Sequence, residues 1–202
     1  MAQIPRRLIL ASTLMLPLAA CDRIGPGAKP GFKGVDITGV DYANELNLTD
    51  ADGRRRTLAD FKGKVSVIFF GYTQCPDVCP TTLAEVAAAR KLLGPDGARV
   101  LAIFVTVDPE RDLPEVLKAY VSSFGADFVG LRGTPEETKA VARQFKIFYS
   151  KVPGKTETSY TIDHTAGAYV LDAKGRARLF TRYGLGPEAL AADLKVLLQE
   201  PA

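Results

Sequence analysis

The chain has 202 residues, of which 47% are hydrophobic and 24% are charged, and its formal net charge is +3. This length and composition suit one globular domain and argue against general disorder. The net charge is too small for a typical nucleic-acid-binding domain, so we expect no nucleic-acid partner. Three cysteines are too few for a disulfide-rich scaffold, and a single histidine excludes any site built from several imidazoles.

The first part of the chain, residues 1–20, is predicted to be an export signal. Arg6 and Arg7 precede an apolar stretch over residues 8–18, which is too short for a membrane span of about 20 residues. The stretch runs into Leu-Ala-Ala-Cys21, which resembles the lipobox of bacterial lipoproteins. This resemblance implies that Cys21 is acylated and anchors a lipoprotein to the bacterial inner membrane, facing the periplasm.

Two features of the export signal stay open. An ordinary secretory peptide cut after Ala20 is the alternative, although such peptides favour a small residue where Leu18 stands. The pair of arginines also allows export by the twin-arginine route instead of the general one. If Cys21 carries the lipid, only two other cysteines remain as thiols.

Residues 21–34 are predicted to form a flexible membrane tether. From Asp22 to Gly34 the chain contains four glycines and two prolines, a composition that cannot bury a core. The folded domain is therefore expected over residues 35–202, with no second linker and no internal repeat.

The first elements of this domain are predicted to be a hairpin, a strand and a helix. Residues 45–49 and 55–58 flank an Asp-Gly turn, which is typical of a β-hairpin. Residues 64–70 are almost continuously apolar, as expected of a central strand buried on both faces. The helix predicted over residues 81–93 ends at a Gly-Pro pair.

A second buried strand and two further helices follow. Residues 100–107 are rich in β-branched side chains, which favour a strand. Capping-box patterns open the two helices, at Asp112-Leu-Pro-Glu115 and at Thr134-Pro-Glu-Glu137. We interpret Asp112 as the cap of the first helix and Asp108 as a strand-end residue.

The chain is predicted to end with a hairpin over residues 167–171 and 176–181 and an amphipathic helix over residues 187–199. The alternation of strands and helices predicts an α/β fold with a mixed central sheet, helices on both faces and an N-terminal β-hairpin. This is a thioredoxin-like architecture in its peroxiredoxin-like variant.

Cys75 and Cys79 lie in the turn that joins the first buried strand to its helix, where ligand sites of open α/β sheets are common. Four helical residues rise about 6 Å and return to one face, so the two sulfurs are placed to form a disulfide or to hold one metal ion. The first turn of a helix also favours thiolate over thiol. A structural disulfide or inert core cysteines are the alternative, but a bridge across so short a loop stabilises little.

The spacing of the cysteines differs from that of thioredoxin-type oxidoreductases. Those enzymes have two residues between their cysteines and normally a cis-proline facing the disulfide. This chain has three residues between Cys75 and Cys79 and no proline in residues 163–167. The difference disfavours simple disulfide exchange with a peptide substrate.

His164 precedes the late strand and is expected beside the cysteines, although a lone histidine is more often a surface or structural residue. Two thiolates and one imidazole form a donor set that suits Cu(I) and, through the imidazole, also Cu(II). Structural zinc usually has four protein ligands, while a catalytic zinc with a bound water is an alternative. Asp163 is a candidate to orient the imidazole.

Three motifs resemble the signatures of the Sco/SenC family. They are Phe-Gly-Tyr-Thr-Gln-Cys-Pro-Asp-Val-Cys-Pro at residues 70–80, Val-Asp-Pro-Glu-Arg-Asp at residues 107–112 and Tyr-Thr-Ile-Asp-His-Thr at residues 160–165. The likeness extends over residues 32–199. Gln74 departs from the pattern because many members have histidine there, at a position that is not regarded as an obligatory ligand.

The resemblance implies a membrane-tethered thioredoxin-fold copper chaperone that binds one copper ion, as Cu(I), Cu(II) or both, through Cys75, Cys79 and His164. Asp77 and Asp163 would then lie around the ligands or at a docking surface. The implied task is assembly of the binuclear copper site in subunit II of cytochrome c oxidase. A periplasmic copper donor protein would be a further partner.

Two other functions could use the same cysteines. A thiol–disulfide oxidoreductase would use Cys75 and Cys79 as a redox pair to reduce the copper-site cysteines of that subunit, and it would not need His164. A peroxidase is the third hypothesis because peroxiredoxins share the fold. The chain lacks an obvious peroxidatic Thr-x-x-Cys motif with an activating arginine, which disfavours this function.

Overall fold

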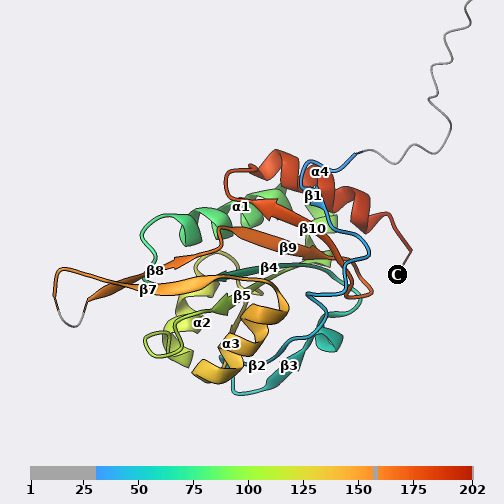
Figure 1. The fold of residues 1–202 in the computed structure, drawn as a ribbon. Coiled ribbons are helices and arrows are strands. Elements are labelled where there is room, and N and C mark those ends of the chain that lie inside the picture. The colour runs from blue at the N-terminus through green and yellow to red at the C-terminus, as the bar shows by residue number, and fades with distance from the viewer. Residues whose placement is uncertain (1–30, 157–158, 202) are drawn as a thin grey trace, which may run out of the picture. The chain divides into compact units, whose positions relative to one another are not determined.

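The computed structural model describes residues 31–156 and 159–201 (Figure 1). The predictions for residues 1–30, which are the signal peptide, acylation of Cys21 and most of the tether, lie outside the described residues. No helix in the described part of the chain combines the length and the apolar character that a membrane span requires.

The folded unit begins at Gly31, four residues before the predicted boundary at Val35. Asp193, a buried residue of the last helix, accepts hydrogen bonds from the backbone N–H groups of Lys33 and Gly34, each at 2.7 Å. Because a buried carboxylate requires such partners, the last residues of the predicted tether are part of the domain.

An eight-stranded mixed sheet forms the centre of the fold, in the order β1-β10-β9-β4-β5-β6-β2-β3. Strands β4 (Val65–Gly71) and β5 (Val100–Thr106) run parallel, whereas β9 (Gly167–Leu171) runs antiparallel to β4 on its other side. All residues of these three strands are buried. This burial explains their nearly continuous apolar sequences.

The remaining strands extend the sheet on both sides. They are β1 (Val35–Asp36), β2 (Asn47–Asp50), β3 (Arg55–Thr57), β6 (Val129–Arg132) and β10 (Ala177–Arg182). The antiparallel pairs β2–β3 and β9–β10 confirm the two predicted hairpins. Strand β6 was not predicted because it is short and contains a glycine, which has a low strand propensity; it forms by pairing with the edge of β5.

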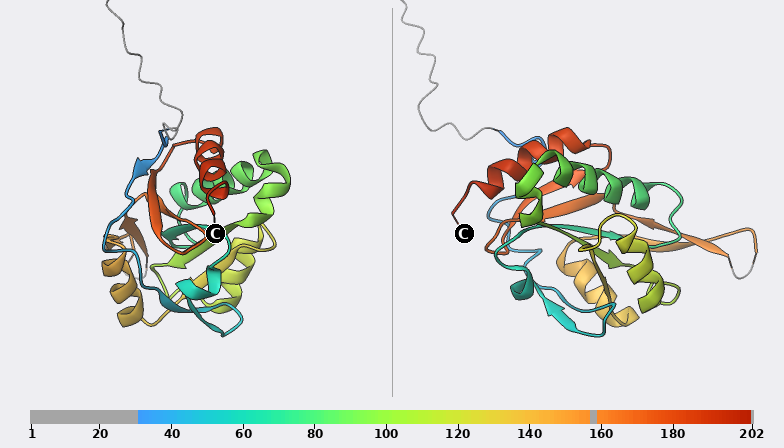
Figure 2. Two further views of the ribbon diagram at one scale, coloured as in Figure 1. Left: turned by 90° about the vertical axis from the view of Figure 1, so that its right-hand side faces the viewer. Right: turned by 180° about the vertical axis from the view of Figure 1, so that it is seen from behind.

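Helices cover both faces of this sheet (Figure 2). Helices α1 (Val78–Leu92), α2 (Pro114–Ser122) and α4 (Pro187–Leu198) lie on one face, where α1 and α4 pack against each other, and α3 (Pro135–Gln144) lies on the other. Two short 3-10 helices occupy Leu58–Phe61 and Gly94–Arg99. The arrangement confirms the predicted α/β architecture with helices on both faces.

Helix α1 begins at Val78, three residues before the predicted start at Thr81. Pro80 lies in its first turn, where a backbone N–H has no partner within the helix, so the missing N–H of proline costs no hydrogen bond. Cys79 therefore belongs to the helix, while Cys75 stays in the preceding turn.

The two predicted capping boxes have different outcomes. At α3, Thr134 and Glu137 exchange side-chain to backbone hydrogen bonds of 2.8 and 3.2 Å, as predicted. At α2 the prediction is wrong, because Leu113 is the N-cap residue and no side chain caps the helix. Asp112 is completely buried instead.

A separate two-stranded sheet projects from the body of the domain (Figure 1). It consists of β7 (Tyr149–Pro153) and β8 (Tyr160–His164), which we call the histidine arm. Most residues of the arm are at least partly exposed, and Ile162 is the buried one. The sequence did not predict this sheet because its strands carry few apolar side chains in alternation.

Candidate metal centre

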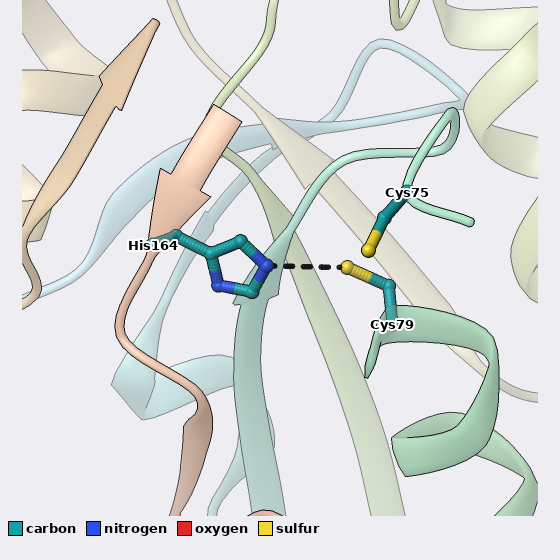
Figure 3. Close-up of side chains that lie close together, drawn as sticks. All are labelled: Cys75, Cys79 and His164. Atoms are coloured by element: carbon teal, nitrogen blue, oxygen red, sulfur yellow. Dashed lines mark hydrogen bonds between the residues drawn. The ribbon is translucent and has the colours of Figure 1, made fainter. Parts of the chain in front are cut away.

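Cys75, Cys79 and His164 come from three segments and converge at one point (Figure 3). Cys75 lies in the turn after β4, Cys79 in the first turn of α1 and His164 at the end of β8. Their ligand atoms, two sulfurs and an imidazole nitrogen, all lie within 4.8 Å of one another. The juxtaposition that the sequence predicted is therefore present.

The two cysteines differ in burial. Cys79 is fully buried and Cys75 is partly exposed, and both are free thiols. The sulfurs do not meet by the predicted helical spacing, because Cys75 precedes α1. A tight turn closes the gap instead, in which the backbone N–H of Cys75 donates a hydrogen bond of 3.2 Å to the carbonyl of Tyr72.

Gly71, the last residue of β4, makes room for the buried sulfur. A Cβ atom at this position would lie 2.6 Å from Sγ of Cys79 and 3.0 Å from ring atoms of Phe69 and Phe104. Such a distance is far shorter than the ordinary contact between a carbon and its neighbours. The sequence motif contains this glycine, but its spacing alone did not reveal this role.

His164 is oriented by its own strand end. Its Nδ1 lies 3.1 Å from the carbonyl oxygen of Thr165, and its Nε2 lies 3.4 Å from Sγ of Cys79. Because a carbonyl can only accept, Nδ1 carries the proton and Nε2 turns its lone pair toward the sulfurs. Phe69 and Tyr72 contact the imidazole edge-on and hold its plane.

The two candidate aspartates lie outside the cluster of ligand atoms. Asp163 is exposed, and the hydrogen bond to the imidazole expected of it is made by Thr165 instead. The physical reason is strand alternation, which turns Asp163 away from the face that carries His164. Asp77 is also exposed, and its carboxylate accepts hydrogen bonds from Tyr183 at 3.4 Å and Thr81 at 3.5 Å.

Burial controls the protonation of two candidate ligands. It raises the pKa of the Cys79 thiol, and a negative charge on Cys75 would raise it further, so the prediction of a thiolate favoured by the helix start is wrong for Cys79. Desolvation of the thiolate outweighs the helix dipole there. Burial also lowers the pKa of His164, against the opposing effects of the Thr165 carbonyl and Asp163, which favours the neutral imidazole that metals bind.

A buried carboxylate supports the turn that carries the cysteines. Asp112 accepts hydrogen bonds from the Thr73 backbone N–H at 3.0 Å, the Thr73 hydroxyl at 2.6 Å and the Thr106 hydroxyl at 2.5 Å. Burial raises its pKa, while these hydrogen bonds act to lower it. The carboxylate thus joins the turn after β4 to the end of β5.

The arrangement can bind a soft metal ion and release it. Two sulfurs and one imidazole nitrogen match the preferences of copper in both oxidation states. Cys75 and His164 are partly exposed, so an incoming ligand can reach the site from solvent. Three donors also leave coordination positions free for a partner's ligand.

Comparison with known proteins places the chain in a family. Residues 36–199 match the model of the SCO1/SenC family. The chain belongs to this family. A SCO2-like protein of Rickettsia felis is 37% identical over 138 residues, which are 68% of this chain and 67% of that protein.

Two solved structures of Sco proteins share the fold. The copper-bound ScoI of Bradyrhizobium japonicum is 44% identical, with a TM-score of 0.70 over 77% of this chain and 99% of that one. A SCO1/SenC family lipoprotein of Bacillus anthracis is 27% identical, with a TM-score of 0.64 over 77% of this chain and 94% of that one. The predicted thioredoxin-like fold of the Sco/SenC family is confirmed.

Proposed function

We propose that this Sco protein is a copper chaperone that holds one copper ion through Cys75, Cys79 and His164. The observation that carries the proposal is the convergence of these three ligand atoms within 4.8 Å. The copper-bound state of the related ScoI supports copper as the metal. Copper is the cargo of such a protein, so the site must both bind the ion and give it up.

The three ligands divide this task. The thiolates of Cys75 and Cys79 hold Cu(I), and the neutral imidazole of His164 adds the nitrogen donor that Cu(II) prefers. Because the Cys79 thiol is protonated in the metal-free protein, copper binding releases a proton from it. The exposed sides of Cys75 and His164 then admit the ligands of an acceptor protein.

The proposed setting is the periplasmic face of the bacterial inner membrane. We propose that residues 1–20 are a lipoprotein signal, that Cys21 carries the lipid and that the residues after it form a short tether. The lipoprotein of Bacillus anthracis in the same family supports the lipid anchor. Sco proteins form a family of cytochrome c oxidase assembly proteins, and the proposed acceptor is the binuclear copper site of subunit II.

A copper titration of the purified chain tests the proposal. We expect one copper ion per wild-type chain, a severe loss of binding in Cys75→Ala and Cys79→Ala, and loss of tight Cu(II) binding in His164→Ala. Asp163→Ala is the matched control, since it removes an exposed neighbour of His164 and should bind like the wild type. Stoichiometric, tight Cu(II) binding by His164→Ala would exclude the imidazole from the site.

A second candidate function is thiol–disulfide exchange with the same subunit. It is favoured by one observation: the two sulfurs are free and lie within 4.8 Å of each other. In this reaction Cys75 and Cys79 lose two electrons and two protons to form a disulfide, while the copper-site disulfide of the acceptor gains them and opens.

A reduction assay on an oxidised subunit II peptide separates the two functions. The exchange needs both cysteines and no histidine, so His164→Ala should reduce the peptide as fast as the wild type if exchange is the function. No reduction by the wild-type dithiol would exclude this second function and leave the chaperone proposal untouched.

A further inference from the structure

The histidine arm has no place in the main sheet. Among the strands of the described residues, β7 and β8 pair only with each other, from Tyr149↔His164 to Pro153↔Tyr160. The cysteines, in contrast, flank the end of a central strand. The position of His164 relative to the sulfurs therefore depends on the two residues that link it to β9 and on side chains that join the arm to the body of the domain.

Arg111 is a side chain that joins the two ligand-bearing segments. Its Nη1 donates one hydrogen bond of 3.0 Å to the side-chain oxygen of Gln74, the residue before Cys75. The same nitrogen donates a second of 3.0 Å to the backbone carbonyl of Tyr160, the first residue of β8. One guanidinium group thus bridges the cysteine turn and the histidine strand.

The surroundings of Arg111 fix its position. Its Nε donates to the carboxylate of Asp108, which is buried, and that carboxylate also accepts a hydrogen bond of 2.9 Å from the Tyr160 hydroxyl. The guanidinium carbon lies 3.6 Å from the centre of the Tyr160 ring and 5.7 Å from that of Tyr72. Stacking of this kind uses the planar guanidinium, which lysine lacks.

Strand β8 connects Tyr160, which Arg111 holds, to the proposed metal ligand His164. Tyr160, Ile162 and His164 lie on one face of the strand because side chains alternate. The anchored ring of Tyr160 and the imidazole of His164 therefore face the body together. An exposed ion pair between Lys151 and Glu110, at 2.7 Å, is a weaker second link between the arm and the loop that carries Arg111.

We propose that Arg111 is the positioning residue that holds the histidine arm against the cysteine turn and so sets the distance from His164 to the two sulfurs. Loss of this clamp frees the imidazole and leaves the dithiol in place. Since the thiolates suffice for Cu(I) and the imidazole adds the preference for Cu(II), the clamp selectively strengthens Cu(II) binding. This consequence for copper rests on the proposed function, whereas the hold on the arm does not.

The first experiment measures the arm without any metal. Arg111→Lys keeps the charge and removes the planar fork, and Arg90→Lys is the matched control. Arg90 makes a comparable set of contacts at the other end of α1, with Asp127, the Gly97 carbonyl and the Phe128 ring. We expect amide hydrogen exchange in Tyr160–His164 to rise at least about tenfold in Arg111→Lys, with no change in β9, and no change in either strand in Arg90→Lys.

The second experiment measures copper. We expect Arg111→Lys to weaken Cu(II) binding about tenfold or more and to lose the nitrogen hyperfine coupling of His164 in the electron paramagnetic resonance spectrum, with Cu(I) affinity nearly unchanged. Gln74→Ala removes only the exposed hydrogen bond between Arg111 and the cysteine turn. Gln74→Ala should also raise hydrogen exchange in β8 and weaken Cu(II) binding, but by less than Arg111→Lys. If Arg111→Lys does not fold, the result for Gln74→Ala tests the proposal in its place.

The outcomes separate the two proposals. Unchanged hydrogen exchange in β8 of a folded Arg111→Lys overturns the clamp, whatever the copper result. Equal weakening of Cu(I) and Cu(II) binding also overturns it, because that pattern indicates a general loss of structure. A wild-type chain that binds no copper overturns the proposed function, while the hydrogen-exchange result still judges the clamp.

Discussion

The turn that carries the cysteines and the arm that carries the histidine are held in the domain by different means. The turn continues a fully buried strand, and Asp112 secures it through three hydrogen bonds to Thr73 and Thr106. The arm lies outside the main sheet. It contacts the body through its own buried side chain Ile162 and through Arg111 of the body, which donates a hydrogen bond to the carbonyl of Tyr160.

This difference has a consequence for the proposed transfer of copper. A buried strand opens only with much of the domain, whereas a small exposed sheet can open locally at a far lower free energy. We therefore expect the sulfurs to keep their places while His164 moves. A copper ion would then lose its nitrogen ligand before its sulfur ligands, which leaves it accessible to an acceptor.

The largest effect is expected from a substitution that displaces a cysteine sulfur. In Gly71→Ala the new Cβ would meet Sγ of Cys79 at 2.6 Å, so the sulfur must move away from the other ligands. We expect copper affinity to fall by about a hundredfold and the free energy of unfolding to fall by about 1–3 kcal/mol. Copper titration and chemical denaturation measure the two effects.

Gly31→Ala is the control for this substitution, because a Cβ there would meet nothing within 4 Å. It should match the wild type in both measurements. Wild-type copper affinity in a destabilised Gly71→Ala would show that the position of the buried sulfur does not govern binding.

A smaller effect is expected from the arm. Ile162 is 4% exposed and lies two residues before His164 on the same face of β8. Ile162→Ala removes the apolar anchor of the arm, a change that costs about 2–5 kcal/mol when the whole structure must tolerate the cavity. Because the arm can lift on its own, we expect global stability to fall by less than this, and Cu(II) affinity to fall about tenfold.

Val152→Ala tests the opposite face of the arm, since Val152 is 37% exposed. It should leave Cu(II) affinity as in the wild type. Equal losses in the two variants would contradict the view that the buried face of the arm positions the histidine.

The smallest expected effect is on the pH dependence of stability, through the Asp112 carboxyl group beneath the cysteine turn. Burial raises the pKa of Asp112, so its contribution to stability is complete below the ordinary carboxyl pKa and is lost as the pH rises through the folded-state value. Asp112→Asn is neutral at every pH and can keep the three contacts, because the Thr73 hydroxyl can accept from the amide. Its melting temperature relative to the wild type should therefore rise from pH 4 to pH 7.

Asp172 is a carboxylate with the opposite behaviour. Despite its burial, hydrogen bonds and the charge of Arg176 lower its pKa. Its stabilisation is present above the ordinary carboxyl pKa and is lost as the pH falls, so Asp172→Asn should be most destabilising at pH 7 and less so near pH 3. The same pH trend in both variants would refute the assigned difference between the two sites.

Much of the fold could be predicted because its signals are local. The apolar runs of β4 and β5, the Asp-Gly hairpin turn and the capping box at Thr134 each specify an element within a few residues. Strand β6 escaped prediction because its pairing depends on partners far along the chain, whereas the histidine arm is a local hairpin whose strands lack an alternating apolar pattern.

The candidate site was predictable to a similar extent. The cysteine spacing and the family motifs identified Cys75, Cys79 and His164. They misjudged Asp112, because a capping-box pattern cannot reveal that the carboxylate is buried beneath the cysteine turn. The motifs contained Arg111 as well, but nothing local indicates that its side chain reaches both Gln74 and Tyr160.

The sequence by itself determined which donors this protein has: two thiols four residues apart and one imidazole, a set whose chemistry favours copper. Only the tertiary structure decided how those donors are held and charged. Burial raises the pKa of Cys79 and lowers that of His164, and packing placed the cysteines beside the main sheet and the histidine on a separate arm. The reason is that desolvation and long-range side-chain contacts depend on which segments lie together in space, and residues 85 positions apart meet here at 3.4 Å.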